Sequence, residues 1–238
     1  MKKRIKVNGF VMFCALLLVV VFPEVFIRHT SLRSFDQIAE IAGFTFLLLG
    51  QLIRVSARGF KAEHSANGRS LIKDGPYMLV RNPMYLGIIL IGLGIVLVLF
   101  KWWVSSIFLA AFLFRYAALI IKEEKKLMDI FPEDYRDYKK RVPRLLPSLS
   151  LLLDKDIAEY LPLKVSWLKK EIAPILIVLL MTIFVESWED IVNNGLRTYF
   201  QETVIIVLIF ILFLILAIYL SKRTVALGQD YANKSKSN

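Results

Sequence analysis

The sequence predicts an all-α protein: a multi-span transmembrane helical bundle of about six spans, with a cytoplasmic amphipathic helical segment. Three observations lead to this fold class. The chain of 238 residues is 57% hydrophobic, and its mean hydropathy is +0.58. Several apolar runs approach the roughly 20 residues that a helix needs to cross a bilayer core. Lys and Arg residues are concentrated in alternate segments between these runs.

The apolar runs define the expected spans. A single run of this kind is compatible with a buried helix of a soluble protein, but six in one chain favour a membrane protein. MKKRIK before the first run imitates a signal peptide. Pro23, Glu24 and Arg28 follow it instead of a small-residue cleavage pattern, so we expect an uncleaved first span. The expected spans are about residues 8–27, 38–57, 84–100, 102–121, 172–188 and 203–220.

The distribution of positive charge predicts the orientation in the membrane. If the N-terminus is inside, the expected inside segments hold 25 of the 31 Lys and Arg residues and the expected outside loops hold 4. This asymmetry fits the positive-inside rule with both termini cytoplasmic. The membrane would be the plasma or inner membrane in a prokaryote and the endoplasmic reticulum in a eukaryote. The net charge of +11 then reflects topology and attraction to anionic headgroups, and predicts no nucleic-acid partner.

The chain divides into regions of different composition. We expect the two C-terminal spans to pack, to anchor the chain or to form an oligomer, because they carry few polar groups. The final ANKSKSN is typical of a disordered tail. Cys14 is the only cysteine, and the two histidines lie in different loops, so no metal site is expected. The expected regions are an N-terminal two-span region 1–62, a core 63–147, an interfacial linker 148–171, a C-terminal two-span extension 172–221 and a polar tail 222–238.

The stretch GPYMLVRNPMYLG leads into the third expected span. Its Gly-Pro pair, at Gly75, predicts a turn. Asn82 followed by Pro83 predicts a helix start, because an Asn side chain can cap free backbone N–H groups and proline is tolerated at the first helical position. The positive end of this helix, with Arg81 beside it, suits an anionic group. The alternatives are that Arg81 only reaches lipid phosphates and that Asn82 only caps the helix.

The third and fourth expected spans are joined only by about residues 100–102, so they should form a tight antiparallel hairpin. The hairpin returns Glu123 and Glu124 to the membrane face where the third span begins. At the C-terminus of a span these two acids would oppose the helix dipole. Acids facing cations would match a zwitterionic ligand. Tyr85 and Gly87 would add an aromatic wall and a close backbone approach, although core packing also explains the glycine.

The segment after the fourth span has an amphipathic pattern. Five apolar or aromatic residues recur at helical spacing, and Pro132 can begin a second helix. This helix would lie on the headgroups or close as a lid over a site at the same face. The five residues are Leu127, Phe131, Tyr135, Tyr138 and Val142.

GPYMLVRNPMYLG followed by EEKKLMDIFPEDYRDYKKRVPRLLP resembles the isoprenylcysteine carboxyl methyltransferase and phospholipid methyltransferase superfamily, over about residues 65–147. The resemblance implies a membrane enzyme that uses S-adenosylmethionine, bound at the cytoplasmic end of the hairpin and covered by residues 125–144. Glu123 would hold polar groups of the cofactor. The resemblance places six further residues in the pocket, and the pattern described above adds Gly75, Arg81 and Gly87. The six are Leu71, Ile72, Tyr77, Asn82, Pro83 and Tyr85.

The chain departs from the superfamily pattern at several positions. Asn82 stands where the pattern has histidine, and Pro132 replaces a glycine. Leu119 stands where an arginine for a substrate carboxylate is expected, with Arg115 one turn earlier, which weakens a prenylcysteine substrate. No catalytic residue is assigned, because displacement at a sulfonium carbon requires alignment and desolvation more than a base. Candidates for positioning the acceptor are Arg115, Glu124 and Arg141.

The leading functional hypothesis is therefore a membrane methyltransferase for a lipophilic acceptor that enters from the bilayer. A carboxylate, a phospholipid amine or another small apolar nucleophile all remain open as the acceptor. A sterol-reductase-like enzyme that uses NADPH is a second hypothesis. A non-catalytic membrane scaffold, in which the motifs serve only as helix caps and headgroup contacts, is the third.

Overall fold

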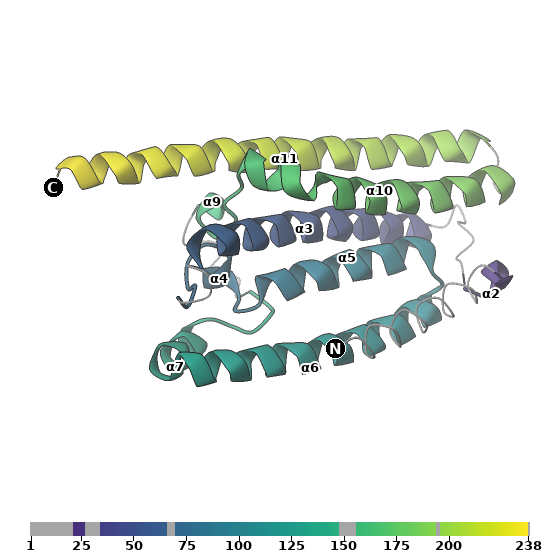
Figure 1. Cartoon of the computed structure of the whole chain (residues 1–238). Coiled ribbons are helices and arrows are strands. Elements are labelled where there is room, and N and C mark those ends of the chain that lie inside the picture. The colour runs from purple at the N-terminus through teal and green to yellow at the C-terminus, as the bar shows by residue number, and fades with distance from the viewer. Residues whose placement is uncertain (1–20, 27–33, 66–69, 148–155, 194–195, 238) are drawn as a thin grey trace.

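The computed structural model describes residues 21–26, 34–65, 70–147, 156–193 and 196–237. These ranges contain helices and short connections and no strand, which confirms the all-α prediction. The long helices run side by side (Figure 1). In chain order the helices are α2 (Pro23–Phe26), α3 (Ser34–His64), α4 (Pro76–Leu79), α5 (Pro83–Leu99), α6 (Trp102–Ile130), α7 (Pro132–Arg141), α9 (Ile157–Tyr160), α10 (Val165–Asn193) and α11 (Leu196–Ser237).

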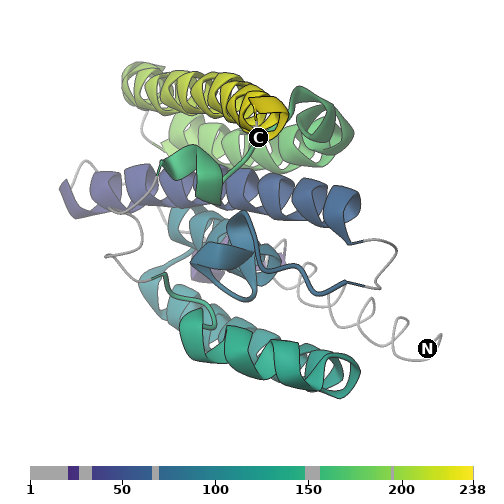
Figure 2. The same cartoon turned by 90° about the vertical axis from the view of Figure 1, so that its left-hand side faces the viewer.

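The helices form successive layers around α3. Viewed along the bundle in Figure 2, α10 and α11 lie on one side of α3, and α5 lies on the other, followed by α6 and α7. The side chains of Phe44, Leu47 and Val55 of α3 are almost fully buried. These side chains belong to a core that continues into α5, α9, α10 and α11. The core therefore sits around α3, and α6 lies at the edge of the bundle.

Three helices in the described part of the chain are long and apolar enough to cross a membrane. They cover Gln37–His64, Trp102–Ile130 and Val204–Gln229, and α5 is a shorter apolar helix. Most of the first expected span, residues 8–20, lies outside the described residues. The fifth expected span, residues 172–188, falls within α10, which is not one of these three helices. A membrane-spanning chain is supported, and six crossings with cytoplasmic termini stay a prediction.

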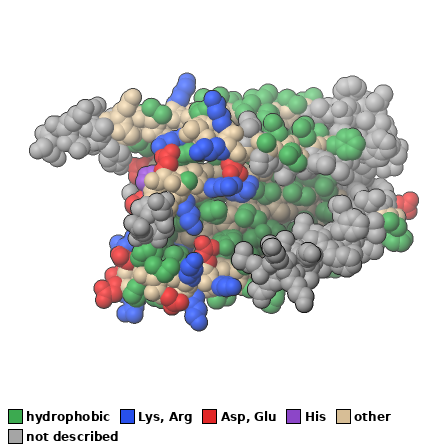
Figure 3. Space-filling view, viewed as in Figure 1, with side chains coloured by type: hydrophobic (Ala, Val, Ile, Leu, Met, Phe, Trp, Pro, Cys, Tyr) green, Lys and Arg blue, Asp and Glu red, His purple; other side chains and the backbone are tan. Residues whose placement is uncertain are grey.

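Charged groups gather at one end of the bundle. Figure 3 shows hydrophobic side chains along its middle, with Lys, Arg, Asp and Glu concentrated where α3 ends and α6 leads into α7. A long apolar body with a charged end is the arrangement that a bilayer favours, because charged groups are costly in hydrocarbon. We call this end, where residues 61–65 and 70–85 meet residues 123–147, the charged end.

The tight connection between α5 and α6 is as expected, but α6 is longer than expected. Only Phe100 and Lys101 separate the two helices. The fourth expected span stops at residue 121, whereas α6 continues to Ile130. Glu123 and Glu124 therefore lie inside a helix, and the prediction that they oppose the dipole at its C-terminus is wrong. The residues after the apolar run, KEEKKLMDI, are mostly strong helix formers, and no proline occurs before Pro132, so the helix continues beyond the expected span end.

The C-terminal helices are attached to α3 at the charged end by polar contacts. The carboxylate of Glu171, on α10, contacts the guanidinium groups of Arg54 at 3.6 Å and Arg58 at 2.5 Å. The indole N–H of Trp167 donates to Glu63 at 2.6 Å.

The prediction that the final ANKSKSN is disordered is wrong, because α11 remains helical to Ser237. A long helix extends readily, since adding residues to its end requires no new nucleation.

Paired glycines bring α3 and α5 into close contact. A Cβ atom added to Gly87 would lie 2.7 Å from the carbonyl oxygen of Gly50, and one added to Gly94 would lie 2.5 Å from that of Gly43. Backbone atoms on the partner helix cannot move aside as a flexible side chain can. The close approach of the two helices therefore depends on these positions having no side chain, as in other membrane helix pairs.

We expect Gly94→Ala to lower the free energy of unfolding by about 1–3 kcal/mol, the usual cost of overpacking. The measurement is thermal unfolding of detergent-purified protein, followed by intrinsic fluorescence. Gly228→Ala, on α11, is the matched control, because nothing lies within 4 Å of the added Cβ. It should leave stability unchanged or raise it by roughly 0.5–1 kcal/mol, since alanine favours a helix more than glycine does. Equal effects of the two substitutions would contradict this packing.

Candidate functional site

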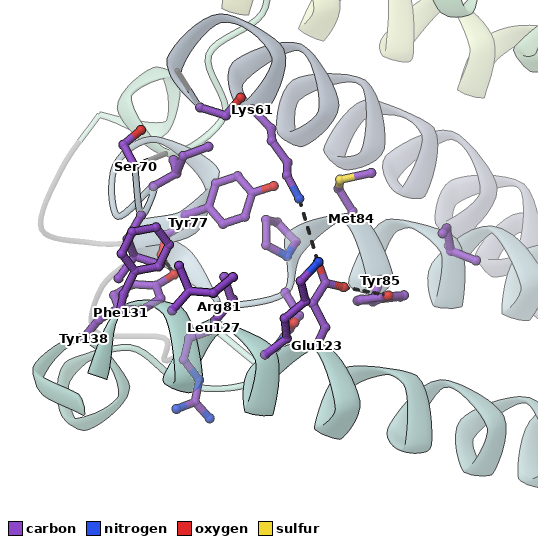
Figure 4. Close-up of a pocket in the computed structure, with 18 residues that line it drawn as sticks. Lys61, Ser70, Tyr77, Arg81, Met84, Tyr85, Glu123, Leu127, Phe131 and Tyr138 are labelled. Atoms are coloured by element: carbon purple, nitrogen blue, oxygen red, sulfur yellow. Dashed lines mark hydrogen bonds and ion pairs between the residues drawn. The ribbon is translucent and has the colours of Figure 1, made fainter. Parts of the chain in front are cut away.

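A cavity of about 440 Å³ opens at the charged end, between α3, α5, α6 and the segment around α4 (Figure 4). Its volume lies within the range of small-molecule sites. The α7 helix contributes Tyr138 to it. The lining residues are Lys61, Ser65, Ser70, Leu71, Ile72, Tyr77, Arg81, Asn82, Pro83, Met84, Tyr85, Ile88, Glu123, Lys126, Leu127, Ile130, Phe131 and Tyr138.

Most of the residues nominated for cofactor binding line this cavity, and two do not. Gly75 has a positive φ of +58°, which favours glycine, and lies against the ring of Phe60. Gly87 packs against α3. Its role is therefore core packing, the alternative raised in the sequence analysis. Gly75 and Gly87 therefore lie near the cavity but do not line it. The nominated residues at the wall are Leu71, Ile72, Tyr77, Arg81, Asn82, Pro83, Tyr85 and Glu123.

Glu123 faces the cavity and is held from two other helices. The Tyr85 hydroxyl on α5 donates to Glu123 Oε2 at 2.7 Å. Lys61 Nζ on α3 lies 3.7 Å from Glu123 Oε1. The Glu123 side chain is 38% exposed, so its carboxylate remains accessible to a ligand. The three side chains form a polar bridge between α3, α6 and α5, and Figure 4 shows them together.

Lys61 is a cavity residue that the sequence did not suggest. The expected span ended at residue 57, which placed Lys61 in a loop. In the structure α3 continues to His64, so Lys61 is fixed on a helix end above the cavity. The predicted orientation already placed Lys61 at the membrane face of Glu123, but only the extension of α3 positions it against the cavity.

Glu124, the next residue, is buried in a different set of contacts. Its side chain is 7% exposed, and its carboxylate lies 3.3 Å from the guanidinium of Arg81 and 3.0 Å from that of Arg144. Asn82 Nδ2 donates to Glu124 Oε1 at 3.0 Å and to the carbonyl of Arg144 at 3.2 Å. Adjacent residues on a helix point about 100° apart, which gives the two glutamates separate surroundings. We call Asn82, Arg81, Glu124 and Arg144 the Glu124 cluster.

The cluster corrects two expectations. Asn82 is the N-cap residue of α5, but its side chain makes no capping hydrogen bond. Its amide instead binds a buried carboxylate, and a hydrogen bond to a charged acceptor is stronger than one to a neutral partner. Arg81 pairs with Glu124, so its charge is already compensated within the protein. Arg144, which was not nominated, supplies the second cation.

The segment after α6 folds back over the cavity. The Tyr138 hydroxyl donates to the carbonyl of Tyr77 at 2.6 Å. The backbone N–H of Arg81 donates to the carbonyl of Pro143 at 2.9 Å. Phe131 and Tyr138 line the cavity wall. These contacts favour the lid alternative over a helix that only rests on headgroups.

The tyrosines around the cavity remain protonated near neutral pH. Burial raises the pKa of Tyr77 and of Tyr138 well above its ordinary value. Burial, and then the nearby Glu124 carboxylate, raises the pKa of Tyr135 to about 12. Their hydroxyls can therefore donate hydrogen bonds, and they are unsuited to accept a proton from a substrate.

Two residues nominated for positioning the acceptor lie away from the cavity wall. Arg115 is an exposed residue of α6, and Arg141 is exposed at the end of α7, where its Nε donates to the carbonyl of Asp137. Glu124, the third, is enclosed in its cluster. The structure thus brings none of the three to the cavity surface.

Known proteins are similar to the segment of this chain that forms the cavity. Residues 38–134 match the phospholipid methyltransferase family. Protein-S-isoprenylcysteine O-methyltransferase of Schizosaccharomyces pombe is 31% identical over 117 residues, which are 45% of this chain and 49% of that protein. Cobalt-zinc-cadmium resistance protein CzcN of Cupriavidus metallidurans is 35% identical over 82 residues, 34% of this chain and 38% of that protein.

These matches confirm the resemblance to the isoprenylcysteine carboxyl methyltransferase and phospholipid methyltransferase superfamily. The chain spans about half of the length of the first relative and less of the second. No solved structure matches. The matched segment contains α5 and α6 and nearly all of the cavity lining.

The two adjacent glutamates should respond differently to the same substitution. We expect Glu124→Gln to lower the free energy of unfolding by about 3 kcal/mol, because it leaves the buried guanidinium of Arg81 without its counter-ion. Glu123→Gln, its matched control, should lower it by less than about 1 kcal/mol, because exposed ion pairs contribute little. Thermal unfolding in detergent measures both. A larger loss for Glu123→Gln would contradict the assignment of the cluster.

Proposed function

We propose that this protein is a membrane methyltransferase that transfers a methyl group from S-adenosylmethionine to a lipophilic acceptor. The observation that carries the proposal is the composition of the cavity within the matched segment. Aromatic and apolar side chains form most of its wall, and the accessible carboxylate of Glu123 supplies one negative charge. This combination suits a nucleoside that carries a cationic sulfonium and an ammonium group.

The residues present fit such a cofactor. Tyr77, Phe131 and Leu71 offer flat and apolar surface for a base, and Glu123 offers an acceptor for an ammonium group. When bound, the cofactor would supply a methyl group that is already activated on its sulfonium. The protein's contribution would be alignment and exclusion of water, because the lid residues Phe131 and Tyr138 close one side of the cavity.

An acceptor from the bilayer has an apolar route to the same cavity. Met84 and Ile88 of α5 and Leu127 and Ile130 of α6 line it. Met84 and Ile88 continue into the apolar length of α5, which contacts α6. Leu127 and Ile130 lie beyond the charged residues 122–126 of α6, at the charged end. Only 6% of the most apolar stretch of α6 is buried within the protein, so this helix is open to lipid. A phospholipid amine fits the absence of an arginine at Leu119 better than a prenylcysteine carboxylate does.

Binding of the demethylated cofactor tests the proposal. Calorimetric titration of detergent-purified protein with S-adenosylhomocysteine should show saturable binding. Glu123→Gln should weaken it by about tenfold or more, since a hydrogen bond to a charged group contributes roughly 1.5–3 kcal/mol. Tyr77→Ala should weaken it by a similar factor, since stacking of a base on an aromatic ring contributes roughly 1–3 kcal/mol. Asp137→Asn, on the exposed side of α7 and outside the cavity lining, is the control and should leave the affinity unchanged.

Titration with NADPH separates the other hypotheses. Saturable binding of NADPH without S-adenosylhomocysteine would overturn the methyltransferase in favour of the reductase. Binding of neither nucleotide to folded protein would favour the scaffold.

A further inference from the structure

The polar bridge across the cavity has a member that neither the motif nor the resemblance assigns. Lys61 reaches Glu123 from α3, within the matched residues 38–134 but before the first of the quoted motifs. Glu123 is the ion-pair partner of Lys61 among the described residues. The pair joins opposite walls of the cavity rather than two neighbours on one helix. Its position raises the question of what happens to it when the cavity is filled.

The Lys61–Glu123 pair is suited to opening. Its N–O distance is 3.7 Å, and the two side chains are 49% and 38% exposed. Ion pairs of this kind contribute little to stability, because water competes with them and both long side chains lose freedom. Separating the two charges therefore costs little. Glu124, one residue further, is the opposite case, since two arginines and an amide enclose it.

Other cations at the cavity are less suited to pair with a ligand anion next to Glu123. Arg81 is 7% exposed and contacts Glu124 and the carbonyl of Lys139. Lys126 is on the same helix as Glu123, nearly one turn away. Lys61 is the cation that stands opposite Glu123 across the cavity, so the two present a positive and a negative group to the same space (Figure 4).

We propose that the Lys61–Glu123 pair opens to bind the amino-acid end of S-adenosylmethionine, with its ammonium on Glu123 and its carboxylate on Lys61. This inference rests on the proposed function. A zwitterion that enters an ion pair replaces one weak contact by two charge-assisted ones, which is energetically favourable in a partly desolvated site. Lys61 is thereby a specificity-determining residue for a cofactor that carries an intact amino acid.

The aromatic residues lie on the other side of the cavity from the pair. Figure 4 shows Tyr77, Phe131 and Tyr138 on one side, and Lys61, Glu123 and Tyr85 towards the other. A base and an amino acid at opposite ends of one molecule match this division. A phosphoethanolamine headgroup also carries an ammonium and an anion, but it has no flat group for the aromatic side. The division therefore favours the cofactor as the source of the zwitterion.

The test compares two ligands that differ only at the amino-acid end. S-adenosylhomocysteine carries it, and 5′-methylthioadenosine lacks it. Each is titrated into wild-type protein and the Lys61→Met, Lys61→Arg and Lys125→Met variants, purified in detergent. Lys125→Met is the matched control, because it removes a lysine charge from the charged end at an exposed position of α6 that does not line the cavity.

Lys61→Met should weaken S-adenosylhomocysteine binding by about tenfold or more, the fold-change expected for one charge-assisted hydrogen bond. Binding of 5′-methylthioadenosine should change less than about twofold, which also shows that the variant is folded. Lys61→Arg should restore most of the affinity for S-adenosylhomocysteine, and Lys125→Met should resemble wild type.

An equal loss for both ligands, or no loss for either, would overturn the assignment of Lys61. Failure of wild-type protein to bind either ligand would instead overturn the proposed function itself. A third titration uses dihexanoyl phosphatidylethanolamine. Lys61-dependent binding of this lipid, with S-adenosylhomocysteine binding independent of Lys61, would move the pair to the acceptor and contradict the proposal.

Discussion

The buried carboxylate of Glu124 is the interaction on which the geometry of the charged end depends. It binds the guanidinium of Arg81 and the amide of Asn82, at the start of α5, and the guanidinium of Arg144, after the lid. One carboxylate on α6 thus fixes two segments that are far apart in the chain. An isolated charge at this depth would be costly, so the cations and the amide are needed together.

The two neighbouring glutamates have different roles: Glu124 stabilises the structure, and Glu123 is available to a ligand. Glu124 has its hydrogen-bonding capacity satisfied by the protein, and it holds α5, α6 and the lid in place. Glu123 accepts a hydrogen bond from Tyr85 and is weakly paired with Lys61, and it faces the cavity. A single helical step, with its change of direction, separates the two roles. A ligand can therefore exchange partners with Glu123 without loosening the cluster that shapes the site.

The sequence predicted the helical class, the close hairpin and most of the cavity wall, because apolar runs and turn residues are local signals. The expected fourth span ended too early, because hydropathy marks the part of a helix that can cross a membrane and not the end of the helix itself. The sequence also could not show that Asn82 binds Glu124 instead of capping α5, because that choice depends on a residue on another helix. Lys61 escaped notice for the same reason: its partner comes from a distant part of the chain.

The most direct test of the account is methyl transfer by the purified protein in vesicles that contain phosphatidylethanolamine. Labelled S-adenosylmethionine is added, and label is measured in the extracted lipid. The account predicts incorporation by wild-type protein and a loss of at least about tenfold in Glu123→Gln, whose stability should be nearly intact. A prenylcysteine derivative, offered in parallel, identifies the acceptor class. Absence of label in any extracted lipid or prenylcysteine, from protein that binds S-adenosylhomocysteine, would contradict transfer to a lipophilic acceptor.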